Sequence, residues 1–238
     1  MSIWGKIGGA AAGLALGGPI GALVGALAGH YMVDRNATPK REERKGIAFT
    51  IGVIALSAKM AKADGVVTED EISAFREVFH VPQQDVKNVA RVFNLAKQDV
   101  RGYEAYAIQL KDLFKDDPVV LEDVLDGLFH IAKADGIMHE AESGYLESVA
   151  MYFGFSEADY GRIRARHVTD HADPYVILGI DRSMSNEAIK AHYRKLVSEN
   201  HPDRLIARGV PEEFVTIATE KIAAINAAYD QIEKERGI

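Results

Sequence analysis

The sequence predicts an all-α protein, and three observations support that class. Apolar residues recur at the three- and four-residue spacing of helices between Ile47 and Ile232, whereas the alternating pattern of strands is scarce. An acidic segment between helices occurs twice, which indicates a repeated helical unit. The N-terminus has the glycine spacing of a membrane helix. The chain of 238 residues therefore divides into a glycine-rich membrane segment (1–34), a charged linker (35–45), a helical domain (46–167) and a C-terminal helical hairpin (173–238).

The composition excludes several classes of protein. The formal net charge of −7 argues against a nucleic-acid-binding protein, which would carry a basic surface. The chain has no cysteine, so it forms neither disulfides nor thiolate zinc sites. It also lacks a glycine-rich phosphate loop, a histidine pair with metal-ligand spacing and a nucleophile elbow. We therefore expect no catalytic activity of its own.

The N-terminal segment is expected to cross a membrane. Residues 7–33 carry no charge apart from the ionisable His30, and this length is enough to span the hydrocarbon core. From Gly5 onward a glycine falls at every fourth position, at Gly9, Gly13, Gly17, Gly21, Gly25 and Gly29. On a helix these glycines form a ridge of bare backbone by which membrane helices pack closely. We therefore expect a homodimer through this ridge.

Three alternatives remain open for this segment. The run from Gly17 to Pro19 would also suit the turn of a re-entrant hairpin, and Ala26–Ala28 resembles a signal-peptidase site. The third alternative is a soluble, flexible tail. The flanking charges bear on orientation, because Lys6 stands alone before the segment and five basic residues follow it between Arg35 and Lys45. The positive-inside rule then places the rest of the chain in the cytoplasm.

The helical domain contains an internal repeat. Ala61–Glu71 is echoed by Ala132–Glu142, and each copy is expected to end one helix, turn at a glycine and begin the next. The duplicated acidic segment resembles the TerB domain, named for tellurite resistance proteins, over roughly Arg44 to His167. Apolar stripes at helical spacing surround both copies.

The carboxylates of this repeat are candidate ligands of a divalent cation. Oxygen ligands of this kind suit calcium, and the candidates are Asp64, Glu69, Glu71, Asp135, Glu140 and Glu142. The spacing of a calcium-binding loop is absent, however, because Val66, Ile72 and Phe75 stand where ligands are required.

A structural role for the same repeat is the alternative. Gly65 and Gly136 would end helices, and Thr68 with Glu71 would form a capping box. If a cation does bind, the corresponding function is that of a stress-response or metal-response adaptor.

The C-terminal region predicts three helices. The first runs from Asp173 to Gly179, and Ser185 caps a second, basic helix. Pro202 pushes the preceding residue toward an extended backbone, so this helix should stop near Asn200 and leave His201–Asp203 as a stiff loop tip. Pro211 opens the third helix, whose apolar residues are expected to face the second: Phe214, Ile217, Ala218, Ile222, Ile225, Tyr229 and Ile232.

These features resemble a J domain, the module of DnaJ-type co-chaperones. The run Tyr193–Leu196, the intact His-Pro-Asp and the run Asn226–Tyr229 carry the resemblance. It implies no enzyme activity but stimulation of ATP hydrolysis by a DnaK-type 70-kDa heat-shock chaperone. The implied partner-binding residues are His201, Pro202, Asp203, Lys190, Arg194, Lys195 and Arg204. Glu199 and Asn200 replace the basic and aromatic residues of many J domains, which lowers the positive charge beside the tripeptide.

The order of the three parts resembles the DjlA type of DnaJ-like co-chaperone. This resemblance implies a bacterial inner-membrane protein that faces the cytoplasm and recruits its partner to the membrane. The link between the two folded domains, Val168–Ala172, is short. We therefore expect the J domain to lie close to the TerB-like domain.

Overall fold

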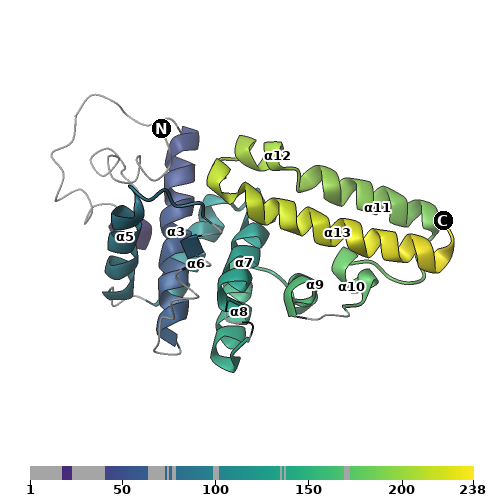
Figure 1. Ribbon diagram of the computed structural model, residues 1–238, viewed down its shortest axis with the longest axis horizontal. Coiled ribbons are helices and arrows are strands. Elements are labelled where there is room, and N and C mark those ends of the chain that lie inside the picture. The colour runs from purple at the N-terminus through teal and green to yellow at the C-terminus, as the bar shows by residue number, and fades with distance from the viewer. Residues whose placement is uncertain are drawn as a thin grey trace.

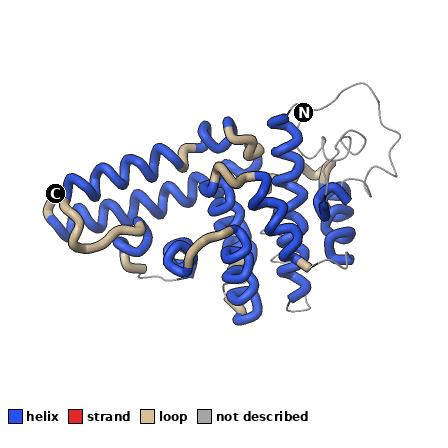
Figure 2. The backbone as a smooth tube through the Cα atoms, turned by 180° about the vertical axis from the view of Figure 1, so that it is seen from behind, coloured by secondary structure: helices blue, strands red, loops and turns tan. Residues whose placement is uncertain are grey.

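The computed structural model describes residues 18–22, 41–63, 73, 75–76, 79–98, 102–134, 136, 138–168 and 172–238. Regular structure in these residues is helical throughout, as predicted (Figure 2). The helical domain comprises α3 (Arg41–Ala63), α5 (Val86–Gln98), α6 (Tyr103–Leu113), α7 (Pro118–Ala132), α8 (Glu140–Phe153) and α9 (Glu157–Val168). The C-terminal domain comprises α10 (Pro174–Leu178), α11 (Asn186–Glu199), α12 (Pro202–Ala207), the 3-10 turn η2 (Glu212–Phe214) and α13 (Val215–Arg236).

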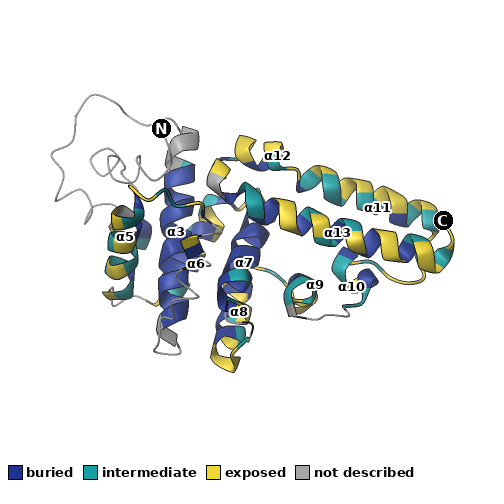
Figure 3. Ribbon diagram, viewed as in Figure 1, coloured by how far each residue is buried: buried dark blue, intermediate teal, exposed yellow. Residues whose placement is uncertain are grey.

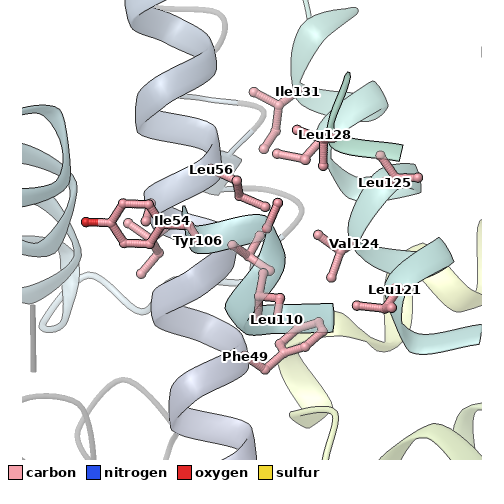
Figure 4. Packing of buried hydrophobic residues seen from close by; sticks show 14 of the residues in the cluster. Phe49, Ile54, Leu56, Tyr106, Leu110, Leu121, Val124, Leu125, Leu128 and Ile131 are labelled. Carbon is pink, nitrogen blue, oxygen red and sulfur yellow. The ribbon is translucent and has the colours of Figure 1, made fainter. Parts of the chain in front are cut away.

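Helix α3 is the centre of the helical domain (Figure 1). Residues 46–61 are all buried, because α5, α6, α7 and α8 pack around this helix. Thr50 and Ser57 donate hydrogen bonds to carbonyls four residues earlier, so their hydroxyls are satisfied inside the core. A Cβ added at Gly52 would lie 2.7 Å from Leu110 of α6, which shows how closely the two helices approach. Figure 4 shows Phe49, Leu56 and Leu110 in this core.

The segment 18–22 packs against the helical domain. Its Ile20 is fully buried in the same core, and the Ile20 N–H donates a hydrogen bond to Gln109 Oε1 of α6 at 2.9 Å. The rest of the membrane span predicted for residues 1–34 lies outside the described residues. Of the glycine ridge only Gly21 is among the described residues. No helix in the described part of the chain combines the length and the apolar character that a membrane crossing requires.

The C-terminal domain has the predicted caps. The Ser185 side chain accepts a hydrogen bond from the Ala188 N–H, and Gly179 ends α10 in the left-handed conformation at φ 66°. Helix α11 ends with Asn200 as its C-cap, as expected. Its Tyr193 ring stacks on Tyr229 of α13, with ring centroids 3.9 Å apart. The helical hairpin predicted from the sequence is therefore present.

Two details of the C-terminal prediction are wrong. The His201–Asp203 segment is not a loop tip, because Pro202 occupies the first turn of α12 and His201 is its N-cap. Proline suits that position, where its missing N–H costs no helical hydrogen bond. The third helix begins at Val215, and the residues after Pro211 form the 3-10 turn η2 instead.

Helix α13 contributes to two cores. Its C-terminal half, with Ile225, Tyr229 and Ile232, packs in the hairpin as predicted. The residues at its N-terminal end, Phe214, Ile217 and Ala218, were expected in the hairpin but lie in the core of the helical domain. The C-terminal domain therefore lies against the helical domain, as the short linker predicted (Figure 1).

Candidate functional site

The His-Pro-Asp turn, which consists of His201, Pro202 and Asp203, is open to solvent. The His201 side chain is 54% exposed and the Asp203 side chain 88% exposed. The two lie 3.7 Å apart, between His201 Nδ1 and Asp203 Oδ2, and the Asp203 N–H donates to His201 Nδ1. The turn is therefore shaped by its own local contacts while both polar side chains stay available to another molecule.

Helix α11 presents a cationic face next to this turn. Lys190, Arg194 and Lys195 are all exposed, as the helical periodicity predicted. Figure 3 shows exposed residues recurring along α11. Lys195 Nζ is 3.9 Å from Glu199 Oε1, a surface pair that contributes little to stability. Arg204, on α12, is also exposed. The structure thus keeps every predicted partner-binding side chain of the C-terminal domain at or near the surface.

Residues that flank the same turn in the sequence are buried. Leu205 and Val210 are each no more than 3% exposed and belong to the core of the helical domain. Asn200 is buried as well, and its Nδ2 donates to the Leu196 carbonyl at 2.8 Å. The Asn200 departure from the usual J-domain pattern therefore has a structural role at the end of α11.

An ion cluster joins the two domains beneath α13. Its acidic members lie on α7 and its basic members on α9 and α13: Glu122, Asp123, Asp126, Arg162, Arg166, His167 and Lys221. Arg162 binds Glu122 through two hydrogen bonds of 2.9 and 2.8 Å. Arg166 Nη2 lies 2.8 Å from Glu122 Oε1 and 2.9 Å from Asp126 Oδ1. The His167 ring stacks on Phe129 at 4.9 Å.

Lys221 is the contribution of α13 to the ion cluster. Its side chain is 1% exposed, and Nζ lies 3.0 Å from both Glu122 Oε1 and Asp123 Oδ1. Close by, a Cβ added at Gly127 of α7 would lie 2.9 Å from Ile217 Cδ1 of α13. The ion pairs of Lys221 and the close contact between α7 and α13 therefore occur in the same region, and both hold the two domains together.

Burial and ion pairing shift the pKa values of the acids in opposite directions. Burial raises the pKa of Asp123 to about 6, although Lys221 opposes the shift, and Asp123 Oδ2 has no hydrogen-bond partner. Burial would also raise the pKa of Asp126, but Arg166, His167 and Lys221 together lower it to about 2. Asp123 is therefore the acid whose charge is least compensated.

Comparisons with known proteins match all three parts of the chain. A family model described as the co-chaperone DjlA transmembrane domain matches residues 1–55, and one described as tellurite resistance protein TerB matches residues 50–165. A DnaJ domain model matches residues 173–236. The "Co-chaperone protein DjlA" of Photobacterium profundum is 31% identical over 223 residues, which cover 82% of this chain and 80% of the relative.

The chain belongs to the DjlA family of co-chaperones. A second relative with the same name, from Coxiella burnetii, is 31% identical over an alignment that covers 75% of this chain and 74% of the relative. No solved structure matches the chain. The family membership and the transmembrane-domain match establish a membrane-anchored J-domain co-chaperone and confirm the sequence-based resemblance.

Of the six carboxylates considered as cation ligands, only Glu140 and Glu142 are among the described residues. Asp64, Glu69, Glu71 and Asp135 lie outside the residues that the structure describes. Glu142 is buried, and its Oε2 accepts a hydrogen bond from the His139 N–H at 3.0 Å, whereas Glu140 is exposed. Among the described residues, no three His, Asp or Glu side chains are placed so that they could hold a metal ion together.

Glu142 therefore has a structural role in the second copy of the repeat. Its bond to His139 reproduces the capping interaction predicted between Glu71 and Thr68 in the first copy. Gly136 was predicted to end α7 but does not cap it, because Lys133 is the C-cap of that helix. Gly136 adopts the left-handed φ of 84° in the turn that follows, where its N–H donates to the Lys133 carbonyl at 2.8 Å. Cation binding stays a prediction.

The ion cluster was not predicted from the sequence. Its acids and bases have the composition of solvated helix faces, and nothing local marks them as buried. The pattern does contain one indication: Glu122 with Asp126, and Arg162 with Arg166, are each four residues apart. This spacing places each pair on one face of its helix. Two faces of opposite charge in neighbouring helices would have predicted contact between α7 and α9.

Proposed function

We propose that this chain stimulates ATP hydrolysis by a DnaK-type 70-kDa heat-shock chaperone and recruits that chaperone to the cytoplasmic face of a bacterial inner membrane. The observation that carries the proposal is the geometry of the His-Pro-Asp turn. Leu205, which follows the turn, is buried in the core of the helical domain, whereas the His201 and Asp203 side chains are exposed. This arrangement supports contact with a second protein.

The cationic face of α11 supports the first step of this mechanism. Lys190, Arg194 and Lys195 would attract an acidic surface of the partner and orient the encounter. Because these side chains are exposed, the interaction should weaken as salt is added. His201 and Asp203 would then make the contacts that favour the hydrolysis-competent state of the partner. The chemistry of ATP hydrolysis belongs to the partner.

Recruitment follows from the membrane anchor. The N-terminal segment would hold the J domain at the membrane, so that the partner acts near clients located there. A homodimer through the glycine ridge, with Gly13 and Gly25 among its members, would present two J domains side by side. Sedimentation in detergent tests the dimer, because a monomer at micromolar concentration contradicts it.

A steady-state ATPase assay tests the proposed stimulation. The chain purified in detergent should accelerate ATP turnover by a DnaK-type chaperone, and both His201→Gln and Asp203→Asn should abolish that acceleration with helix content unchanged. Asp230→Asn is the matched control, because Asp230 is an exposed acid on α13 away from the turn. Full stimulation by either turn variant, with normal folding by circular dichroism, contradicts the proposal.

A further inference from the structure

The segment that follows the His-Pro-Asp turn is held by the helical domain through a partly buried ion pair. Arg208 Nε lies 3.2 Å from Asp117 Oδ1, and the two side chains are 25% and 24% exposed. Asp117 belongs to the turn between α6 and α7, within the helical domain. The Arg208 Nη1 group also donates to the Glu199 carbonyl at the end of α11, at 3.3 Å. One guanidinium therefore connects the helical domain, α11 and the end of α12.

Apolar contacts hold the same segment from below. The Phe214 ring packs against two rings of the helical domain. Its centroid lies 4.5 Å from that of Phe49 and 4.6 Å from that of Phe79. Leu205, in the middle of α12, is 2% exposed in that core, whereas Asp203 two residues earlier points to solvent. In Figure 4 the C-terminal ribbon passes beside the Phe49 end of the core.

Helix α12 depends on these contacts for its order. It contains 6 residues, fewer than an isolated helix needs to be stable in water. Its first residues carry the His-Pro-Asp turn, because His201 is the N-cap and Pro202 the first helical residue. Loss of the contacts below and beside α12 would therefore change how often the turn has the arrangement seen here.

We propose that the helical domain positions the His-Pro-Asp turn for its partner, and that Asp117 is a positioning residue that acts through Arg208. This inference rests on the proposed stimulation of a DnaK-type ATPase. Below saturation, a partner that needs the ordered turn responds in proportion to the fraction of chains in which the turn is ordered. The helical domain then contributes to stimulation of the partner, in addition to separating the J domain from the membrane.

Simple electrostatics predicts the opposite effect for a change at Asp117. Removal of a negative charge from a chain that docks through cationic side chains should strengthen attraction to an acidic partner and raise stimulation. The positioning role predicts lower stimulation. The sign of the change therefore separates the two explanations.

The experiment compares Asp117→Asn with Asp117→Glu, Arg208→Gln and the double variant Asp117→Asn/Arg208→Gln in the full-length chain. Asp116→Asn is the matched control, because it removes the same charge from the neighbouring, exposed position. ATPase stimulation at a sub-saturating concentration of the chain and amide hydrogen exchange of residues 204–210 are measured for each.

Asp117→Asn should lower this stimulation by up to about fivefold, the full effect of one partly exposed ion pair on the fraction of ordered turn. It should also speed exchange in residues 204–210, while α3 and α7 remain protected. Asp117→Glu should retain stimulation, Asp116→Asn should behave as the parent, and Asp117→Asn should add nothing once Arg208→Gln is present. Stimulation equal to or above that of the parent, or unchanged exchange in Asp117→Asn, overturns the inference. If the parent chain itself fails to stimulate, the proposed function is wrong, and the exchange measurement still decides whether Asp117 orders the segment.

Discussion

The substitution Lys221→Met tests the ion cluster that joins the two domains. Lys221 Nζ lies 3.0 Å from Glu122 Oε1, 3.0 Å from Asp123 Oδ1 and 3.7 Å from Asp126 Oδ2. Methionine has a similar length and volume, so the change removes the charge with little loss of packing. Removal of one member of a buried ion pair costs about 3–5 kcal/mol, because the remaining charge is left without compensation.

The structure places the expected loss at the lower end of that range. Asp123 already has a pKa of about 6 with Lys221 present, and loss of Lys221 would raise this pKa further. Asp123 can then take up a proton near neutral pH, which limits the electrostatic cost. We expect Lys221→Met to lower the free energy of unfolding by about 3 kcal/mol at pH 7.

Urea unfolding followed by circular dichroism measures this loss. Lys234→Met is the matched control, because Lys234 is exposed on the same helix and should change stability by less than about 0.5 kcal/mol. The double variant Lys221→Met/Asp123→Asn should recover part of the loss, since it removes one acid together with one base. A Lys221→Met variant as stable as the Lys234→Met control would refute the reasoning about the ion cluster.

Two further predictions concern pH and orientation. Because the pKa of Asp123 is raised to about 6, the folded chain keeps a proton on Asp123 between about pH 4 and pH 6, where the unfolded chain has released it. The contribution of Asp123 to the free energy of unfolding therefore falls by roughly 3 kcal/mol as pH rises through that window. Asp123→Asn lacks this loss, and urea unfolding at pH 4 and pH 7 should show its advantage over the parent growing by that amount; an unchanged difference contradicts the prediction. The orientation can be tested with Ser198→Cys on exposed α11, because the chain has no cysteine of its own. In intact bacteria a membrane-impermeant thiol reagent should leave this residue unlabelled until the inner membrane is opened, and labelling of intact cells would contradict a cytoplasmic J domain.

Local sequence features predicted the elements of the C-terminal domain well. Ser185, Gly179 and Pro202 each restrict the backbone through their own chemistry, so helix ends could be placed without knowledge of the rest of the chain. The same features did not predict α12. Pro202 ends the preceding helix and also begins the next, and only the first of these roles was predicted.

The packing between domains was harder to predict, for a physical reason. Helical periodicity shows which face of a helix is apolar but not which partner covers that face. Phe214 and Ile225 therefore belonged to one stripe in the sequence, although they lie in different cores. The buried acids Glu122 and Asp123 were missed in the same way, because charged residues are rarely buried unless they are paired.

The most direct test of the central claim is a single-turnover measurement of ATP hydrolysis by a DnaK-type chaperone. The chaperone is loaded with ATP, mixed with the parent chain or with Asp203→Asn at the same concentration, and followed by the release of phosphate. The account predicts that the parent accelerates the hydrolysis step and that the variant leaves the rate at the level of the chaperone alone. Equal acceleration by both chains would contradict it.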